Sequence, residues 1–426
     1  MPERPATCVL VSDFNLRNFA GYAANDPEPP ALHPVLAAPG EPVPALLDPA
    51  APHWEPRPEA ALIWTQPQSV SPAFAALLRC EPASGRQALA EVDEFCARLQ
   101  AIGGRVGHAF VPTWVLPTQR RVFGLLDTQT DVGPTNTLMR MNLRLMENLE
   151  RAANLHVLNA QRWIEAAGAG AFAPKLWYLG KIPFGNAVFR EAVRDVKAAL
   201  RGGTGGARKL VIVDLDDTLW GGVVGEVGWE RLVLGGHHHA GEAFADFQHA
   251  LKSLKNRGVL LAVVSKNEEA VALEAIRRHP EMVLSVDDFA ARRINWQDKA
   301  HNVLEVLGEL NLGPQSAVFI DDNPAERARV RESLPEVLVP DWPRDPVHYP
   351  TALLSLACFE TPSLSAEDLA RSALYLSESR RAELKRAVGS TEEWLKGLAV
   401  RVRVEALGPA NLQRAAQLLN KTNQMN

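Results

Sequence analysis

The chain has 426 residues, of which 46% are hydrophobic and 22% are charged, so about two or three globular domains with sizeable cores are expected. The formal net charge of -5 argues against a broad nucleic-acid-binding surface. No apolar run reaches the roughly 18 residues that a membrane helix needs. Four scattered cysteines without a Cys-x-x-Cys pair favour a cytoplasmic protein over a disulfide framework or a zinc site.

Residues 1–200 are predicted to form one α/β domain, because short apolar runs alternate with stretches of helical periodicity. Strands are expected at 7–14, 61–65 and 105–117. Helices are expected at 85–104, 134–155 and 186–202. The segment 25–58 is rich in Pro and Ala and is expected to be irregular, and the stretch 201–208 is predicted to be a flexible linker.

Strands and helices alternate again over residues 209–360, and the strands are continuously apolar, which predicts a parallel sheet covered on both faces. Strands are expected at 209–215, 259–266, 282–286 and 316–322. Helices are expected at 242–258, 267–280 and 298–313. Beyond this sheet a charged helix is predicted at 361–390, and residues 391–426 look too short to build a core of their own.

The first candidate catalytic residues are crowded at the end of the strand 209–215. Asp214 and Asp216 are two residues apart, so in extended backbone they share one side. One carboxylate can attack a phosphorus atom while the other protonates the leaving oxygen. Like charges this close are unfavourable unless a cation offsets them, which predicts a divalent cation and phosphate chemistry.

A second acidic pair, Asp321 and Asp322, ends another apolar strand. Together with the first pair it is predicted to hold Mg²⁺, which prefers oxygen ligands. Ser265 ends the strand 259–266 and can hydrogen-bond a phosphoryl oxygen, and Lys299 begins a helix whose N-terminus favours an anion. Active sites of parallel sheets lie at the carboxyl ends of strands, where all of these residues are placed.

This order of motifs (Asp-x-Asp-x-Thr, Ser, Lys and Asp-Asp) resembles the haloacid dehalogenase (HAD) superfamily of phosphotransferases. The resemblance implies a doubly wound, Rossmann-like parallel sheet. It implies that Asp214 is the nucleophile that forms an aspartyl-phosphate and that Asp216 is the general acid and base. Asp214, the backbone of Asp216 and Asp321 would hold Mg²⁺, with Asp322 as a further candidate ligand.

The same resemblance implies a phosphate-binding set. Ser265 and Lys299 would neutralise the phosphoryl oxygens, and Thr218 would support the loop around them. Lys266 directly follows Ser265 and opens a helix together with Asn267, so these two residues are counted as phosphate-binding candidates as well.

Within the superfamily, residues 209–360 resemble the FkbH-like family (subfamily IIIC-like, glyceryl-acyl carrier protein synthases) through stretches such as LWGGVVGEVGWERLVLG and VFIDDNPAERARVRESLPEV. The resemblance implies an enzyme that takes the glyceryl group of 1,3-bisphosphoglycerate, removes phosphate, and loads glyceryl as a thioester onto the phosphopantetheine arm of an acyl carrier protein in polyketide biosynthesis. The stretch LLNKTNQMN resembles a segment that opens an acyltransferase-like region in longer members, so 391–426 is expected to be a truncated start of it.

Two departures from that family bear on the chemistry. Asp217 stands where relatives often have Asn, which places an additional carboxylate near the metal. Val264 stands where many relatives have Cys. If a cysteine holds the glyceryl group in transit, Cys8 and Cys358 are candidates by elimination, each with the alternative of a buried structural thiol. Direct attack of the carrier thiol on the acyl phosphate needs no enzyme cysteine.

The N-terminal half begins with a strand followed by Asp13-Phe14-Asn15, which faintly resembles the first block of the SGNH hydrolases. Phe14 stands where the nucleophilic serine would be. The resemblance implies a binding or scaffold domain that has lost esterase chemistry. The alternative is that Asp13 and Asn15 cap a turn.

Other features keep two interpretations each. The histidines His237–His239 are interpreted as a polar loop before a helix, although His239 could instead bind substrate. The aromatic stretch 177–184 could form a ligand-binding wall, but core packing is the preferred interpretation. Arg292 and Arg293 could bind a second phosphate or an acidic carrier surface, with a solvated face as the default.

Two other functions stay open beside the glyceryl transferase. One is a small-molecule or protein phosphatase without acyl transfer. The other is a non-catalytic docking protein that binds the carrier with a degenerate site. The intact catalytic set argues against the docking protein, because every charged group that phosphoryl transfer requires is present.

Overall fold

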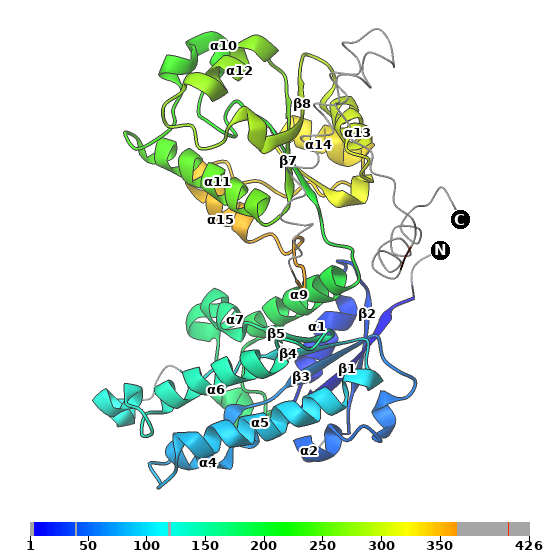
Figure 1. The fold of residues 1–426 in the computed structure, drawn as a ribbon, viewed down its shortest axis with the longest axis vertical. Helices are drawn as coiled ribbons and strands as arrows, with labels where there is room; N and C mark the ends of the chain where they lie inside the picture. Colours follow the sequence, from blue (N-terminus) through cyan, green and yellow to red (C-terminus); the bar gives the residue numbers. More distant parts are fainter. Residues whose placement is uncertain (1–3, 39–40, 118–120, 364–407, 409–426) are drawn as a thin grey trace. The chain divides into compact units, whose positions relative to one another are not determined.

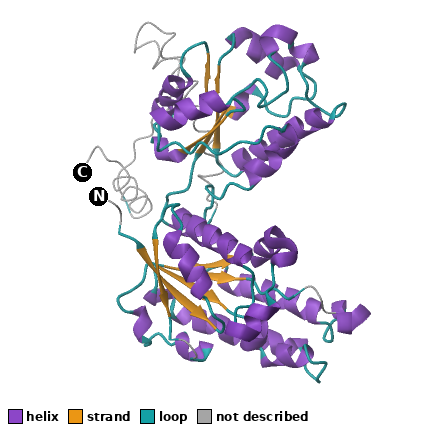
Figure 2. Ribbon diagram, turned by 180° about the vertical axis from the view of Figure 1, so that it is seen from behind, coloured by secondary structure: helices purple, strands orange, loops and turns teal. Residues whose placement is uncertain are grey.

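The computed structural model describes residues 4–38, 41–117, 121–363 and 408. These residues form two parallel sheets with helices on both faces, which confirms the predicted α/β fold class (Figures 1 and 2). Apart from 361–363 and 408, the predicted helix at 361–390 and the acyltransferase-like segment 391–426 lie outside the described residues. None of the helices in this part of the chain has the length and apolar character needed to cross a bilayer.

The first sheet has the strand order β2-β1-β3-β4-β5, with all neighbouring strands parallel. Its strands are β1 (Ala6–Ser12), β2 (Leu32–Leu36), β3 (Ala60–Trp64), β4 (His108–Pro112) and β5 (Leu155–Leu158). Side chains alternate between the faces of β1, so Val9 and Val11 enter one core while Cys8 and Leu10 enter the other. The chain therefore buries this sheet on both sides, as the continuous apolar strands require.

Helices cover both faces of the first sheet. They are α1 (Arg17–Asn25), α2 (Val43–Leu46), α3 (Pro67–Val70), α4 (Pro72–Leu77), α5 (Gly85–Ala101), α6 (Pro134–Leu149), α7 (Ala160–Ala167), α8 (Pro174–Gly180) and α9 (Asn186–Gly203). Helices α5 and α6 pack on one face, and α1, α7 and α9 pack on the other (Figure 1). The longest of them carry apolar residues at helical spacing, which is why the sequence predicted α5, α6 and α9 near their observed positions.

The segment 25–58 was expected to be irregular. This is wrong for residues 32–36, which form the edge strand β2, and for residues 43–46, which form the short helix α2. The proline at position 34 hid the strand, because proline cannot donate a backbone hydrogen bond. An edge strand pairs on one side only and tolerates a proline there. The predicted linker 201–208 also begins inside a helix, since α9 continues to Gly203. A Cβ atom at Gly203 would lie 2.8 Å from the His108 ring, so this ring would have to shift to admit a larger residue in the helix.

The second sheet has the strand order β8-β7-β6-β9 and is again fully parallel. Its strands are β6 (Leu210–Val213), β7 (Leu260–Ser265), β8 (Phe289–Ile294) and β9 (Ala317–Ile320). Its helices are α10 (Val224–Val227), α11 (His239–Asn256), α12 (Glu269–Arg278), α13 (Lys299–Glu309), α14 (Pro324–Ser333) and α15 (Tyr349–Leu354). The strand order reverses at β6, so the loops that follow β6, β7 and β9 meet at one edge of the sheet.

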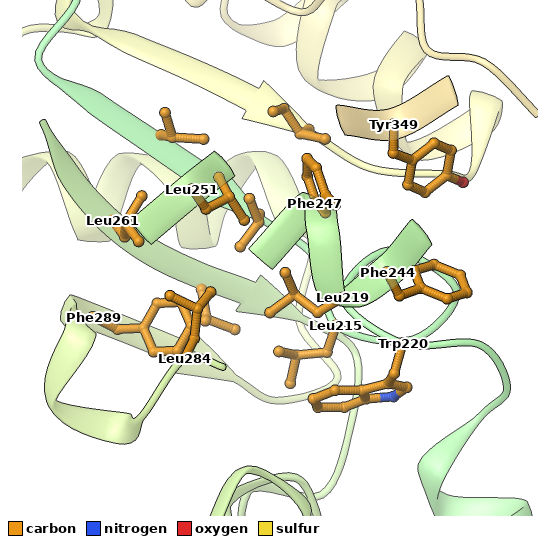
Figure 3. Packing of buried hydrophobic residues seen from close by; sticks show 14 of the residues in the cluster. Leu215, Leu219, Trp220, Phe244, Phe247, Leu251, Leu261, Leu284, Phe289 and Tyr349 are labelled. Atoms are coloured by element: carbon orange, nitrogen blue, oxygen red, sulfur yellow. The ribbon is translucent and has the colours of Figure 1, made fainter. Parts of the chain in front are cut away.

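A large apolar core fixes the loop that follows β6. Leu215, Leu219 and Trp220 of this loop belong to one apolar cluster with Phe247 of α11 and Tyr349 (Figure 3). All five side chains are buried. Buried apolar side chains flank the polar residues of this loop. They fix the loop backbone, and so the polar side chains are attached to a rigid part of the chain.

The strand predicted at 282–286 is wrong, because the fourth strand of this sheet is β8, Phe289–Ile294. The preceding residues instead form a turn that ends in a 3₁₀ helix at Val286–Asp288. Two arginines, Arg292 and Arg293, hid the true strand from an analysis based on apolar runs. They are tolerated because β8 is the edge strand of the sheet.

Candidate active site

Asp214 is the first residue after β6, and its backbone N–H still donates to the Ile320 carbonyl of β9. Its buried carboxylate lies beside the ammonium of Lys299, which is 3% exposed and begins α13. The Lys299 Nζ atom is 3.0 Å from Asp214 Oδ2 and 2.6 Å from Asp321 Oδ2. The loops after β6 and β9 and the start of α13 thus converge on one buried cation between two carboxylates.

Three carboxylates gather at this point and are called the acidic triad here: Asp214, Asp321 and Asp322. Each offers an oxygen within 4.8 Å of the others. Asp214 Oδ1 is buried and has no hydrogen-bond partner among the described residues, while Oδ2 of the same side chain contacts Lys299. An unpartnered buried carboxylate oxygen is unfavourable unless a cation binds it. The donor set therefore fits a hard divalent cation, which takes oxygen ligands.

The Asp216 carboxylate accepts three hydrogen bonds. Its Oδ1 atom accepts from Trp220 Nε1 at 2.9 Å and from the Val224 backbone N–H at 3.1 Å. Its Oδ2 atom accepts from Asn267 Nδ2 at 2.7 Å. The Asp216 carboxylate is not in the acidic triad, which agrees with the expectation that only the backbone of Asp216 would bind the metal, and that role of the backbone stays a prediction.

Burial sets the protonation of the site. It raises the pKa of Asp216, and the negative charge of Asp214 acts in the same direction against the hydrogen bonds that the carboxylate accepts. Burial and the charge of Asp214 also raise the pKa of Asp321 and of Asp322. Burial alone would lower the pKa of Lys299, but Asp214 and Asp321 reverse this and raise it. The Lys299 ammonium and the Asp216 carboxyl, whose protonated form is favoured by burial, thus lie at the same edge of the sheet.

Thr218 connects the two acidic loops. Its hydroxyl accepts the backbone N–H of Asp322 at 3.2 Å and lies 3.3 Å from Asp322 Oδ1. Thr218 is fully buried, so these contacts join the loop after β6 to the loop after β9 inside the protein. Ser265, also buried, is the last residue of β7, the strand next to β6. Both positions agree with the edge of the sheet at which the sequence placed them.

Two predicted phosphate ligands have other partners. The Lys266 ammonium lies 2.6 Å from Glu326 Oε1. The Asn267 amide donates to Asp216 Oδ2. Both side chains thus have protein partners in this arrangement, and their assignment as phosphate ligands stays a prediction. Asn267 is also a positioning residue for Asp216.

Asp217, the residue at which the family resemblance breaks, does not join the acidic triad. Its φ is +54°, in the left-handed region that Asn and Asp tolerate better than most residues. Its Oδ1 atom accepts the Gly222 backbone N–H at 2.7 Å. The additional carboxylate therefore closes the loop after β6, as an asparagine oxygen could also do.

Sequence reasoning missed two residues that hold the acidic loops in place. Arg327 Nη1 donates to the backbone carbonyls of Asp321 and Asp322 at 2.7 and 2.6 Å. The Tyr349 hydroxyl donates to the Asp217 carbonyl at 3.2 Å. Arg327 follows Asp321 by six residues in the chain, so helix geometry at α14 could have indicated it. Tyr349 carries no local signal, because only the folded core brings it there.

The cysteine candidates are poor nucleophiles. Cys8 and Cys358 are both buried. Burial raises the pKa of the Cys8 thiol to about 12 and that of the Cys358 thiol to about 11. A thiol with such a pKa is almost entirely protonated near neutral pH, so both fit the structural interpretation.

The residues that prompted the SGNH resemblance have structural partners. Asp13 Oδ1 accepts the Gln66 backbone N–H at 3.0 Å, and Asn15 Oδ1 accepts the Arg17 backbone N–H at 2.9 Å. Phe14 is buried. The Asn15 contact fits the alternative that this residue closes a turn, whereas Asp13 connects the loop after β1 to the loop after β3. The resemblance itself stays a prediction.

Among the remaining candidates, His238 Nδ1 accepts the Ala240 backbone N–H at 3.2 Å and so caps α11. This contact fits the interpretation of the three histidines as a polar loop before a helix. Arg293 lies 2.6 Å from Glu305 and 2.8 Å from Glu309, both on α13. Its guanidinium therefore forms ion pairs that connect β8 to α13.

Comparison with solved structures identifies a protein of similar fold. The chain is similar to the crystal structure of the N-terminal part of the protein BF1531 from Bacteroides fragilis, which contains a phosphatase domain and is complexed with Mg. The match has a TM-score of 0.76 and 29% sequence identity, and it covers 84% of this chain and 95% of that chain. Such coverage is far longer than residues 209–360, so the similarity extends into the first sheet. No protein-family model matches the chain. No curated protein matches it either.

Proposed function

We propose that this protein is a Mg²⁺-dependent phosphatase of the HAD type that forms a phosphoenzyme on Asp214. The observation that carries the proposal is the buried Asp214 carboxylate, which has one oxygen beside Lys299 and the other without a hydrogen-bond partner among the described residues. The similarity to a phosphatase domain complexed with Mg supports the choice of cation.

The chain's own residues divide the reaction into two steps. An oxygen of Asp214 attacks the phosphorus atom, and the bond from phosphorus to the leaving oxygen breaks as Asp216 donates a proton to that oxygen. Asp216 then accepts a proton from the water that hydrolyses the aspartyl-phosphate, which restores both carboxyl groups. Ser265 and Lys299 bind the phosphoryl oxygens and hold them in line.

The acidic triad and the Asp216 carbonyl would hold the Mg²⁺, which supplies charge neutralisation for the phosphoryl group. When all three carboxyl groups are ionised, the acidic triad carries three negative charges against the one positive charge of Lys299. A divalent cation removes this imbalance, so the phosphate dianion can approach the carboxylates.

Trapping of the phosphoenzyme tests the assignment of the nucleophile. Wild-type protein exposed briefly to ³²P-labelled acetyl phosphate and Mg²⁺ should acquire a hydroxylamine-sensitive label. Asp214→Asn should not be labelled. Asp217→Asn is the matched control, because Asp217 is a neighbouring carboxylate whose side chain closes the loop at Gly222. Unlabelled wild type, or full labelling of Asp214→Asn, would contradict the proposal.

For the substrate we infer 1,3-bisphosphoglycerate or a related phosphorylated three-carbon acid, with glyceryl transfer to the phosphopantetheine thiol of an acyl carrier protein. The support is the resemblance of residues 209–360 to FkbH-like proteins. An acyl phosphate is already activated, so the enzyme needs only to bring the thiol close and stabilise the developing oxyanion. The buried, protonated thiols of Cys8 and Cys358 favour direct attack by the carrier thiol over a relay through either of them.

Intact-mass analysis of a phosphopantetheinylated carrier mixed with the protein, Mg²⁺ and 1,3-bisphosphoglycerate separates the candidates. A mass gain of one glyceryl unit supports the transferase. Release of free phosphate without a change in the carrier supports a phosphatase without acyl transfer. Neither product would support the non-catalytic docking protein.

A further inference from the structure

The aromatic stretch 177–184 is not the simple core segment that the sequence favoured. Tyr178 and Leu179 on α8 are 81% and 74% exposed. Phe184, at the other end of the stretch, is buried and stacks on Trp64 with 5.1 Å between ring centroids. One end of the stretch thus belongs to the core, while the other presents large apolar side chains to solvent.

A cavity of about 370 Å³ lies beside this stretch. Its walls come from the loop after β3, the loop after β4 and α8, and its lining residues are Gln66, Pro67, Gln68, Val115, Leu116, Pro117, Phe172, Pro174, Trp177, Tyr178, Pro183 and Phe184. The cavity therefore lies at the carboxyl ends of β3 and β4 in the first sheet. Ligands of doubly wound sheets bind at this edge, and the volume falls within the range of small-molecule sites.

The lining has a distinct chemistry. It is made of aromatic, aliphatic and proline side chains, together with the amides of Gln66 and Gln68 and the hydroxyl of Tyr178. No Asp, Glu, Lys, Arg or His is among these described lining residues. A charged ligand would lose its hydration here without a charged partner among these lining residues, and the Lys181 ammonium lies at the wall, 5.0 Å from the centroid of the Trp177 ring. An uncharged ligand would lose little hydration. The Gln68 amide donates to the side-chain oxygen of Gln66, and the donors and lone pairs that this bond leaves unused can orient a neutral ligand.

The walls are also stiff. Four of the lining residues are prolines, whose φ is fixed by the ring. Phe184 rests on the buried aromatic residues Phe14 and Trp64, with centroid distances of 5.8 and 5.1 Å. Phe184 thus connects the cavity wall to the packed core, so its position is already fixed before a ligand binds.

We propose that this cavity is a second ligand site, which takes an uncharged small molecule with an aromatic body and a hydrogen-bonding group that meets Gln66 or Gln68. It belongs to the first sheet and contains none of the residues of the acidic triad. This proposal can therefore be tested independently of the phosphatase assignment.

Two fluorescent probes with the same ring system test the charge selectivity. N-phenyl-1-naphthylamine is uncharged, and 8-anilino-1-naphthalenesulfonate adds a sulfonate to the same framework. The full chain should bind the neutral probe saturably at one site and bind the sulfonate probe at least about tenfold more weakly. Equal affinity for the two probes, or an increase in fluorescence without saturation, would overturn the proposal.

Variants of the wall locate the bound probe. Tyr178→Ala removes an aromatic wall and should raise the Kd for N-phenyl-1-naphthylamine about fivefold or more. Leu116→Trp fills the cavity and should abolish saturable binding. Leu179→Ala is the matched control, because Leu179 is an equally exposed neighbour on α8 that does not line the cavity. If Leu179→Ala weakens binding as much as the two wall variants, or if neither wall variant weakens it, the cavity is not the site.

Discussion

Lys299 is the residue on which the electrostatics of the active site depend, because it contacts two carboxylates at 3.0 and 2.6 Å while almost fully buried. Lys299→Met should lower kcat for p-nitrophenyl phosphate about 100-fold or more, because the phosphoryl charge loses its cation. Without metal, the free energy of unfolding should also fall by about 3 kcal/mol, because two carboxylates are left buried together.

Steady-state kinetics and urea unfolding measure these two effects. Lys266→Met is the matched control, since its ammonium pairs with Glu326 and is partly exposed. That variant should keep kcat and the unfolding free energy close to wild type. Equal losses in the two variants would contradict the claim that the buried ammonium of Lys299 has a distinct role in catalysis and stability.

Asn267 should act through Asp216, to which it donates at 2.7 Å. Asn267→Ala should slow the hydrolysis of phenyl phosphate, a poor leaving group, about tenfold more than that of p-nitrophenyl phosphate, which needs less protonation. A comparison of kcat for the two esters gives the result. A uniform loss on both esters would assign Asn267 a role in folding or binding instead.

At the residue scale, the sequence predicted the convergence of Asp214, Asp321 and Lys299, because each follows or begins an element at the same sheet edge. It could not predict the partners of Asp216, Lys266 or Asn267. Those partners depend on loop paths and side-chain rotamers that no local pattern specifies. The sequence therefore placed these residues at the correct edge of the sheet, but it did not predict which polar group each side chain contacts.

At the element scale, the turn before β8 is held to α11 by a buried carboxylate. Asp288 accepts from Lys252 at 2.6 and 2.7 Å and from Lys255 at 2.8 Å, and it also accepts from Ser285. Burial alone would raise the pKa of Asp288, but these donors outweigh it and lower the pKa from 3.8 to about 2. The ionised form is therefore favoured by folding.

This shift predicts a pH-dependent contribution to stability. A carboxyl with a lowered folded pKa stabilises the protein above its unfolded pKa and loses that contribution as the pH falls from about 4 to about 2. Asp288→Asn should reduce the free energy of unfolding by roughly 1–2 kcal/mol near neutral pH, and about half of this difference should be lost by about pH 3.

Urea unfolding of both proteins at the two pH values measures the change. Asp246→Asn, an exposed carboxylate on α11, serves as the control and should behave like wild type. A pH-independent difference between wild type and Asp288→Asn would show that the pKa of Asp288 is not lowered in the folded state.

The elements that the sequence predicted best are those with long, regular patterns, such as α5, α9 and β7. The edge strands β2 and β8 escaped because their compositions, with a proline in one and two arginines in the other, suit a strand paired on a single side. Edge position is a property of the whole sheet, so a local analysis cannot detect it.

At the scale of the whole molecule, both parallel sheets follow from the alternation of apolar strands with amphipathic helices. The second sheet presents the acidic triad at its carboxyl edge, and the first presents an apolar cavity at the corresponding edge. The proposal of glyceryl transfer to a carrier is supported by the resemblance of sequence motifs. A fold can host many reactions, so that part of the account needs the carrier experiment.

Calorimetric titration with Mg²⁺ tests the central claim most directly, because it measures the cation site without relying on turnover. Wild type should bind Mg²⁺ at one site, Asp321→Asn should lose that binding, and Asp217→Asn should keep it, since Asp217 closes a loop outside the acidic triad. Undiminished binding by Asp321→Asn, or no binding by wild type, would contradict the assignment of the acidic triad as a metal centre.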